Sequence, residues 1–179
     1  MIGKYAASAA AALIALAGAS QSHAADATGQ KFIKEAIQGN LAEVKVGQLA
    51  QDKGSSQGVK DFGAALVKDH GMANQNATQA AQQMSVTPPD KPGMKQTAVY
   101  TKLSALSGEH FDRQFIKDMV KDHQEDIAKY QKEAGQSGPA ADYAKQTLPK
   151  LREHLKMAQD LEKGEHVASA SHSSKTETR

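Results

Sequence analysis

The sequence contains no cysteine and no tryptophan, and aromatic residues make up only 4% of it. The lack of cysteine excludes disulfides, zinc–thiolate sites and thiol catalysis. Neither sign of charge dominates, because 22 basic residues stand against 20 acidic ones. Without an extended basic face or many aromatic stacking residues, nucleic acid is not expected as a partner. Stability must therefore come from helix packing or from a bound ligand.

Two common kinds of catalytic motif are also missing. No serine lies in a Gly-x-Ser-x-Gly setting, and no glycine-rich loop has the spacing of a phosphate-binding motif. Hydrolysis through a nucleophile and nucleotide chemistry therefore have no support in the sequence. Whether the protein is an enzyme stays open, and the sequence favours one that is not.

The first residues have the pattern of a secretory signal peptide. Lys4 supplies a positive charge, Ala6–Ala17 is an apolar run, and Ser22-His23-Ala24 fits a cleavage site. We expect cleavage after Ala24 and a periplasmic or secreted mature protein. The apolar run is shorter than the roughly 20 residues that span a bilayer, and nothing later resembles a membrane span. The mature chain is therefore expected to have no membrane-spanning segment.

A short segment that ends in Lys-Asp-His occurs twice, as Phe62–His70 and as Phe115–His123. A looser third copy ends at His154. Each histidine lies within the apolar stripe of its helix, because apolar residues stand four positions before it, seven positions after it, or both. The acidic residue before each histidine lies at the edge of that stripe, where it meets solvent or a neighbouring helix. Three helices are thus predicted to direct one histidine each into a shared interior.

Helical periodicity and turn residues divide the rest of the chain. Thr28 is expected to cap the first helix. The segment Val86–Gly93 contains three prolines, cannot be helical and forms the one long connection. Pro149 lies inside the last helix, so either this helix bends at Thr147-Leu148 or it starts at Pro149. The predicted helices are Gln30–Lys53, Gln57–Met84, Lys95–Leu106, Phe111–Ala134 and Pro139–Lys163.

The expected architecture is all-α, because no segment alternates as a strand would. Four long helices form one bundle, with a long crossover loop between the second and the third. The domain boundaries are a signal peptide at 1–24, a bundle at 25–164 and a tail at 165–179. The tail lacks periodicity and is predicted to be disordered. Whether the protein forms a homo-oligomer, and which protein partner it has, stays open.

Several segments together resemble a large bacterial family called domain of unknown function 4142. The resemblance covers roughly residues 28–163. It implies an exported bacterial protein with a ferritin-like four-helix bundle, and it implies no established activity. The segments that carry it are Phe32–Ala36 with Glu43, Leu66–His70, Leu106–Asp112 leading to His123, and Thr147–His154.

Ferritin-like bundles build di-iron sites from glutamates and Glu-x-x-His motifs. This chain departs from that pattern, because Val67, Val120 and Leu151 stand three residues before the three histidines. A carboxylate-bridged di-iron site is therefore not expected. Three imidazoles and a carboxylate would instead suit iron, zinc, copper or nickel. The candidate metal ligands are His70, His123 and His154, joined by Glu43, with Asp126 as a further candidate.

The same histidines also have a purely structural interpretation. A buried neutral histidine is tolerated when both ring nitrogens find partners, so the three with Glu43 or Asn40 would form a polar network that fixes helix register. Three functions stay open at this point. They are a metal-binding protein of storage, buffering or stress defence, a non-catalytic envelope protein acting through its surface, and a redox-metal enzyme acting on peroxide or superoxide.

Overall fold

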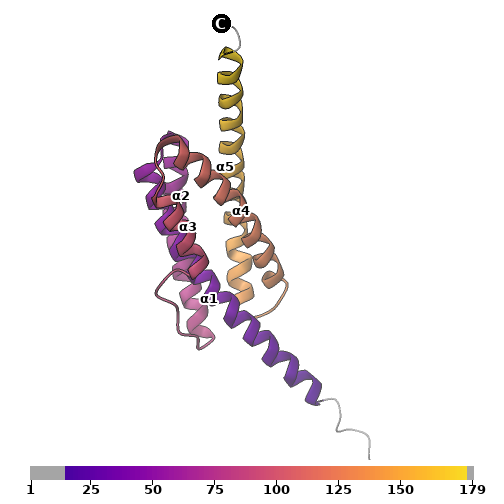
Figure 1. The fold of residues 1–179 in the computed structure, drawn as a ribbon. Helices are drawn as coiled ribbons and strands as arrows, with labels where there is room; N and C mark the ends of the chain where they lie inside the picture. Colours follow the sequence, from indigo (N-terminus) through magenta and orange to yellow (C-terminus); the bar gives the residue numbers. More distant parts are fainter. Residues whose placement is uncertain (1–14, 177–179) are drawn as a thin grey trace, which may run out of the picture.

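A computed structural model describes residues 15–176, with side chains described for residues 27–164. The described chain contains helices and no strands, which confirms the all-α prediction (Figure 1). Four of the helices are long and one is short, as the periodicity predicted. The helices are α1 (Ala15–Lys53), α2 (Gln57–Gln83), α3 (Met94–Ser104), α4 (Gly108–Ala134) and α5 (Pro139–Thr176).

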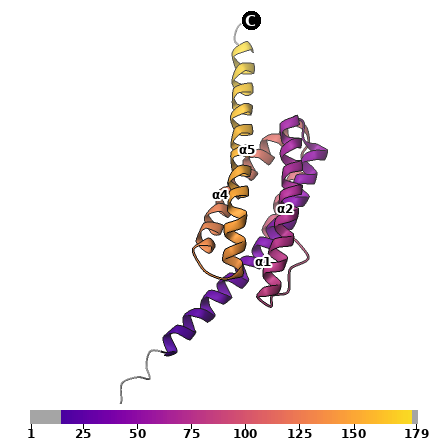
Figure 2. The same cartoon turned by 180° about the vertical axis from the view of Figure 1, so that it is seen from behind.

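The long helices form two hairpins that pack against each other. As the chain proceeds, α1 and α5 rise in Figure 1 while α2 and α4 descend. The helix α1 packs on α2, α4 packs on α5, and α2 also contacts α5. The predicted long connection, Val86–Gly93, joins α2 to α3, and α3 packs along α1 before the chain enters α4. Figure 2 shows the bundle from behind.

The first helix begins earlier than predicted, at Ala15 instead of Gln30. Thr28 therefore lies inside α1 and is not its N-cap. The preceding segment is rich in alanine, the strongest helix former, and contains no proline, so nothing ends the helix there. The predicted cleavage site after Ala24 falls within α1 and stays a prediction. Residues 1–14 of the predicted signal peptide lie outside the described part of the chain.

The last helix runs through Pro149 without a break, which excludes a start at that residue. Proline has no N–H group, so the carbonyl of Lys145 loses its helical donor, but Lys145 is exposed to water. The predicted end of this helix at Lys163 is wrong, because the backbone of α5 stays helical to Thr176. The division into a bundle and a tail at Gly164 stays a prediction, and residues 177–179 are not described.

The core consists of two apolar clusters separated by a layer of buried polar residues. Both clusters draw side chains from α1, α2, α4 and α5. Along each of these helices the polar residue lies between members of the two clusters, as His70 lies between Leu66 and Ala77. The buried polar residues of this layer are Asn40, Glu43, His70, His123 and His154.

Buried contacts also fix how the helices meet at the end of the bundle where α1 turns into α2. The Asp112 carboxylate of α4 accepts hydrogen bonds from the backbone N–H groups of Ser55, at 2.8 Å, and Ser56, at 2.7 Å. Ser56 in turn caps α2 by accepting from the N–H of Val59. A buried charge that receives two N–H donors at a helix start is well compensated. The turn between α1 and α2 is thereby fixed to α4.

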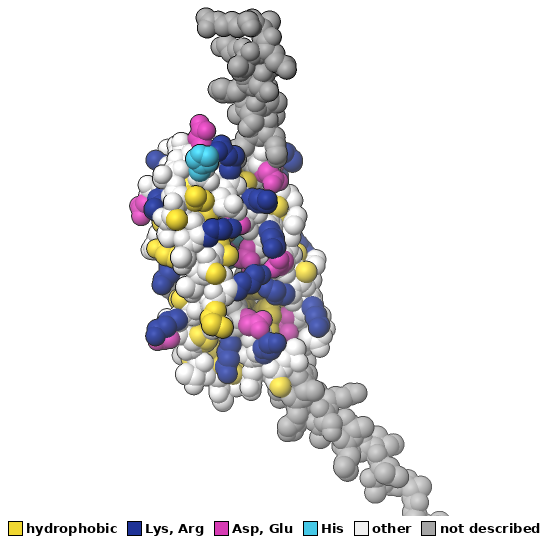
Figure 3. Space-filling view, in the orientation of Figure 1, with side chains coloured by type: hydrophobic (Ala, Val, Ile, Leu, Met, Phe, Trp, Pro, Cys, Tyr) yellow, Lys and Arg dark blue, Asp and Glu magenta, His cyan; other side chains and the backbone are white. Residues whose placement is uncertain are grey.

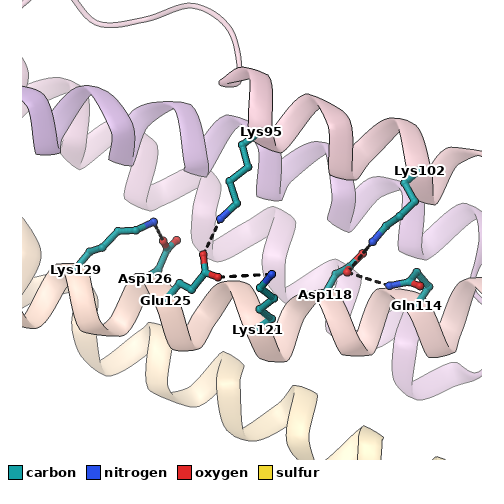
Figure 4. Close-up of polar contacts among 8 residues, drawn as sticks. All are labelled: Lys95, Lys102, Gln114, Asp118, Lys121, Glu125, Asp126 and Lys129. Carbon is teal, nitrogen blue, oxygen red and sulfur yellow. Dashed lines mark hydrogen bonds and ion pairs between the residues drawn. The ribbon is translucent and has the colours of Figure 1, made fainter.

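Ion pairs hold the short helix α3 against α4 (Figure 4). Lys95 lies 2.6 Å from Glu125, and Lys102 lies 2.6 Å from Asp118. Charges of both signs are interspersed over the face of the bundle that Figure 3 shows. Within the described chain, no helix combines the length and the apolar character that a membrane crossing requires.

Candidate metal centre

The structure brings together one histidine from each of three helices. His70 of α2, His123 of α4 and His154 of α5 form what we call the histidine triad. Their ring centroids are 5.8 Å (His70–His123), 5.2 Å (His70–His154) and 5.4 Å (His123–His154) apart. One ring nitrogen of each lies within 4.8 Å of one ring nitrogen of both others. The predicted shared interior is therefore observed, at one depth in the bundle.

The side chains of the triad are almost fully buried. The relative exposures of His70, His123 and His154 are 4%, 2% and 1%. The ring of Phe62 lies 6.0 Å from His154 and 6.4 Å from His123, so an aromatic ring closes one side of the triad. Any charge placed here would interact strongly with its ligands, because the surroundings are apolar.

In two of the three histidines the position of the ring proton follows directly from the neighbouring acceptor. His123 Nδ1 lies 3.0 Å from the carbonyl oxygen of Met119, one turn earlier in α4. His154 Nε2 lies 3.0 Å from a carboxylate oxygen of Asp69 on α2. A carbonyl and a carboxylate only accept, so in both contacts the ring nitrogen must donate.

The third histidine is oriented through a chain of side chains. His70 Nδ1 lies 2.9 Å from Asn40 Oδ1, and Asn40 Nδ2 donates to the hydroxyl of Tyr143 at 2.9 Å. Tyr143 also contacts the hydroxyl of Tyr130 at 3.3 Å. Because the amide nitrogen of Asn40 donates to Tyr143, the amide oxygen faces His70 and accepts a hydrogen bond from its Nδ1–H group.

The second nitrogen of every ring is left with a lone pair and without a donor. These atoms are His70 Nε2, His123 Nε2 and His154 Nδ1. All three are buried and have no hydrogen-bond partner among the described residues. A neutral imidazole that donates through one nitrogen is an acceptor, or a metal ligand, through the other.

The surroundings also favour the neutral form of each ring. Burial and the neighbouring His123 and His154 lower the pKa of His70 well below its ordinary value. Burial, aided by His154, lowers the pKa of His123 to about 4. Burial lowers the pKa of His154 too, against the opposing effect of Asp69. The three rings are thus deprotonated at neutral pH, as metal binding requires.

The two predicted carboxylate ligands do not join the group of nitrogens. Glu43 lies on α1 in the same polar layer, 5% exposed, with its Oε2 atom lacking a hydrogen-bond partner. Burial, together with Asp122 and Asp126 of α4, raises its pKa well above the ordinary value. Asp126 pairs with Lys129 at 2.9 Å. The group within mutual reach of one ion consists of the three histidines, and metal binding by Glu43 or Asp126 stays a prediction.

A sequence model of a protein family, described as domain of unknown function (DUF4142), matches residues 15–161. The chain belongs to the DUF4142 family. The matched range includes the whole histidine triad and confirms the resemblance seen in the sequence. No curated protein and no solved structure matches the chain. The family match therefore establishes membership of DUF4142, and the ferritin-like relationship stays a prediction.

Sequence reasoning missed one partner of the triad in this DUF4142 chain. Asp69 was expected at the edge of the stripe, in contact with solvent or a neighbouring helix. It contacts His154 and also lies 3.6 Å from Lys150, so it bridges α2 to α5. Its position immediately before His70 in the repeat was the available signal. Tyr143, whose hydroxyl accepts a hydrogen bond from Asn40, gave no such signal.

Two pockets of the DUF4142 bundle reach the triad from different sides. The first, of about 370 Å³, lies between α1, α3 and α4 and includes His70, Asn40 and Asp126 in its lining. The second, of about 200 Å³, lies between α2 and α5 and is lined by both His70 and His154. We call them the α1–α3–α4 pocket and the α2–α5 pocket.

Proposed function

We propose that this protein is exported to the bacterial envelope and there binds one transition-metal ion through His70, His123 and His154. The ion would be stored or buffered, or kept from causing oxidative damage. One observation carries the proposal. Each of the three neighbouring rings donates one N–H group to a protein acceptor and leaves its other nitrogen buried without a donor.

Leaving three buried ring nitrogens without a partner destabilises the folded protein unless something binds them. A buried acceptor without a partner costs about 1–3 kcal/mol, and three neighbouring lone pairs also repel one another. A single water molecule has two protons and would leave one nitrogen unsatisfied. A cation accepts all three lone pairs at once, which favours a metal ion over water as the missing partner.

The acceptors around the triad support the same conclusion. Metal-binding histidines commonly donate their other N–H group to a carboxylate or a carbonyl, which fixes the ring and makes it a better ligand. Asp69, the Met119 carbonyl and Asn40 have this role here. The alternative is a polar network that only sets helix register. Such a network needs a partner for both nitrogens of each ring, but the described residues provide a partner for only one nitrogen of each.

The chemistry of the ligands narrows the metal. Imidazole nitrogens suit iron, zinc, copper and nickel, and the chain has no thiolate that would select a softer site. Three protein ligands also leave room for a fourth ligand on a tetrahedral ion. The choice among these metals is left to measurement.

The test is elemental analysis of the mature, untagged protein purified without chelators. We expect about one metal ion per chain in the wild type, and its loss in a variant with His70, His123 and His154 all changed to alanine. The variant His110→Ala is the matched control, because it removes an exposed histidine outside the triad. A wild type that retains no metal after exposure to iron, zinc, copper and nickel in turn would overturn the proposal.

A further inference from the structure

The α2–α5 pocket leads from the surface of the bundle to the histidine triad. At its inner end lie His70, His154 and Leu151, all of them buried. At its outer end lies Met72, which is 49% exposed. The pocket therefore offers a path from solvent to two of the three proposed metal ligands.

The triad by itself does not complete a coordination sphere. A tetrahedral ion needs four ligands, and Glu43 is not within the group that shares one ion. An ion held between His70 and His154 would lie next to the pocket that both of them line. The α1–α3–α4 pocket touches the triad through His70 alone, and Asn40 stands in its lining beside that ring.

The size and lining of the α2–α5 pocket indicate what it would admit. Its volume of about 200 Å³ corresponds to roughly six or seven water molecules, since each occupies about 30 Å³ in the liquid. Besides the two histidines, its lining combines the apolar side chains of Met72, Ala73 and Leu151 with the polar ones of Asn76, Gln146 and Thr147. The charges of Asp69 and Lys150 at its side compensate each other at 3.6 Å. These walls suit a small neutral or singly charged molecule.

We propose that the α2–α5 pocket admits a small oxygen- or nitrogen-donor molecule, of the size of peroxide or azide, to an open coordination position on the ion. This rests on the proposed function, because without a bound ion such a molecule would have no metal to coordinate. The site is then a centre that binds an external ligand as well as a store for the ion.

The probe is azide, added to protein in which Co²⁺ occupies the site. Co²⁺ accepts imidazole ligands, and its visible absorption changes when a further ligand binds. Titration with azide should alter the spectrum of the wild type. The variant Ala73→Phe, which fills the pocket from α2, should weaken azide binding at least about tenfold while the Co²⁺ content stays at one per chain.

Two control variants test the route. Ala64→Phe places the same ring on an exposed position of the same helix. Gly39→Phe fills the α1–α3–α4 pocket from a position where an added Cβ meets nothing within 4 Å. Both should leave azide affinity within about twofold of the wild type. If Ala73→Phe loses helix content, Met72→Trp, which fills the exposed outer end of the pocket, replaces it.

The outcomes separate the two proposals. A wild type that binds no Co²⁺ counts against the metal site itself. A wild type that binds Co²⁺ but shows no spectral response to azide overturns the open position and leaves the metal site standing. Loss of azide binding in Gly39→Phe, but not in Ala73→Phe or Met72→Trp, overturns the route through the α2–α5 pocket.

Discussion

At the scale of the residue, the acceptor that each histidine faces determines which ring nitrogen carries the proton. The Met119 carbonyl and the Asp69 carboxylate fix His123 and His154 in different tautomers, so their free nitrogens are Nε2 and Nδ1 respectively. A ring that turned over would lose its acceptor and bring its N–H group among the other rings. The triad is thereby held, without any ion, in the tautomers that the proposed metal site requires.

Keeping His123 neutral has a consequence for stability. Its pKa is about 4 in the folded protein, against an ordinary value of 6.5. Between these values the unfolded chain binds a proton that the folded protein does not, so the free energy of unfolding falls as the pH falls. From pH 7 to pH 5 we expect His123 to contribute a loss of about 2 kcal/mol. Urea denaturation of the metal-free protein at both pH values measures it.

The control for this prediction is His123→Gln, which should lose that share of the pH dependence. Glu43 acts with the opposite sign, because its raised pKa makes the folded protein retain a proton that the unfolded chain releases above pH 4.5. The difference between wild type and His123→Gln, not the slope of either alone, is therefore the quantity to compare. Equal slopes in the two proteins would contradict the depressed pKa.

At the scale of the element, α1 and α2 approach each other closely where two glycines meet. A Cβ atom on Gly47 would lie 2.6 Å from the carbonyl oxygen of Gly63, and one on Gly63 would lie 2.6 Å from the carbonyl oxygen of Gly47. Both helices thus pack backbone against backbone at this point. The contact lies on the side of the triad where Val46 and Leu66 belong to one apolar cluster.

We predict that Gly63→Ala lowers the free energy of unfolding by about 1–3 kcal/mol, because the added methyl group forces the two backbones apart. Gly39→Ala is the matched control on α1, since an added Cβ there meets nothing within 4 Å. It should be neutral, or stabilising by up to about 1 kcal/mol, because alanine is the better helix former. Chemical denaturation of both variants measures the contrast, and equal effects would mean that the helices do not meet as described.

The helices themselves were predictable from the sequence, because apolar periodicity and turn residues are local signals. The bounds of α2 and α4, and the long connection that follows α2, agree closely with expectation. The start of α1 was not predictable from a good capping residue at Thr28, since the alanine-rich segment before it is equally able to form a helix. Pro149 was ambiguous because a helix tolerates a proline where the freed carbonyl reaches water.

The candidate site was predictable only in part, for a different physical reason. The position of each histidine within its stripe is local, so the inward direction of all three could be inferred. Their common depth depends on turn lengths and on the offset between helices, which periodicity does not contain. The same limit applies to Asp69, whose contact with His154 depends on how α5 is rotated against α2. It also applies to Asn40, oriented by a tyrosine of α5.

At the scale of the whole molecule, the triad joins the two hairpins of the bundle. His70 belongs to the hairpin of α1 and α2, whereas His123 and His154 belong to that of α4 and α5. The polar layer interrupts the core between two apolar clusters, where hydrophobic contact is weakest. An ion in this layer would replace three unsatisfied acceptors with bonds between the two halves.

The folded protein should therefore gain stability from the metal in proportion to its free concentration. An ion that binds the folded state alone adds about 4 kcal/mol to the free energy of unfolding when its concentration is 1,000 times the dissociation constant. Thermal unfolding in buffered Zn²⁺ measures this as a rise of the melting temperature that grows with free metal. The rise should persist in His110→Ala and vanish in the triple alanine variant. A rise that survives in the triple variant would place the stabilising ion at another site, because that variant lacks all three imidazoles of the triad.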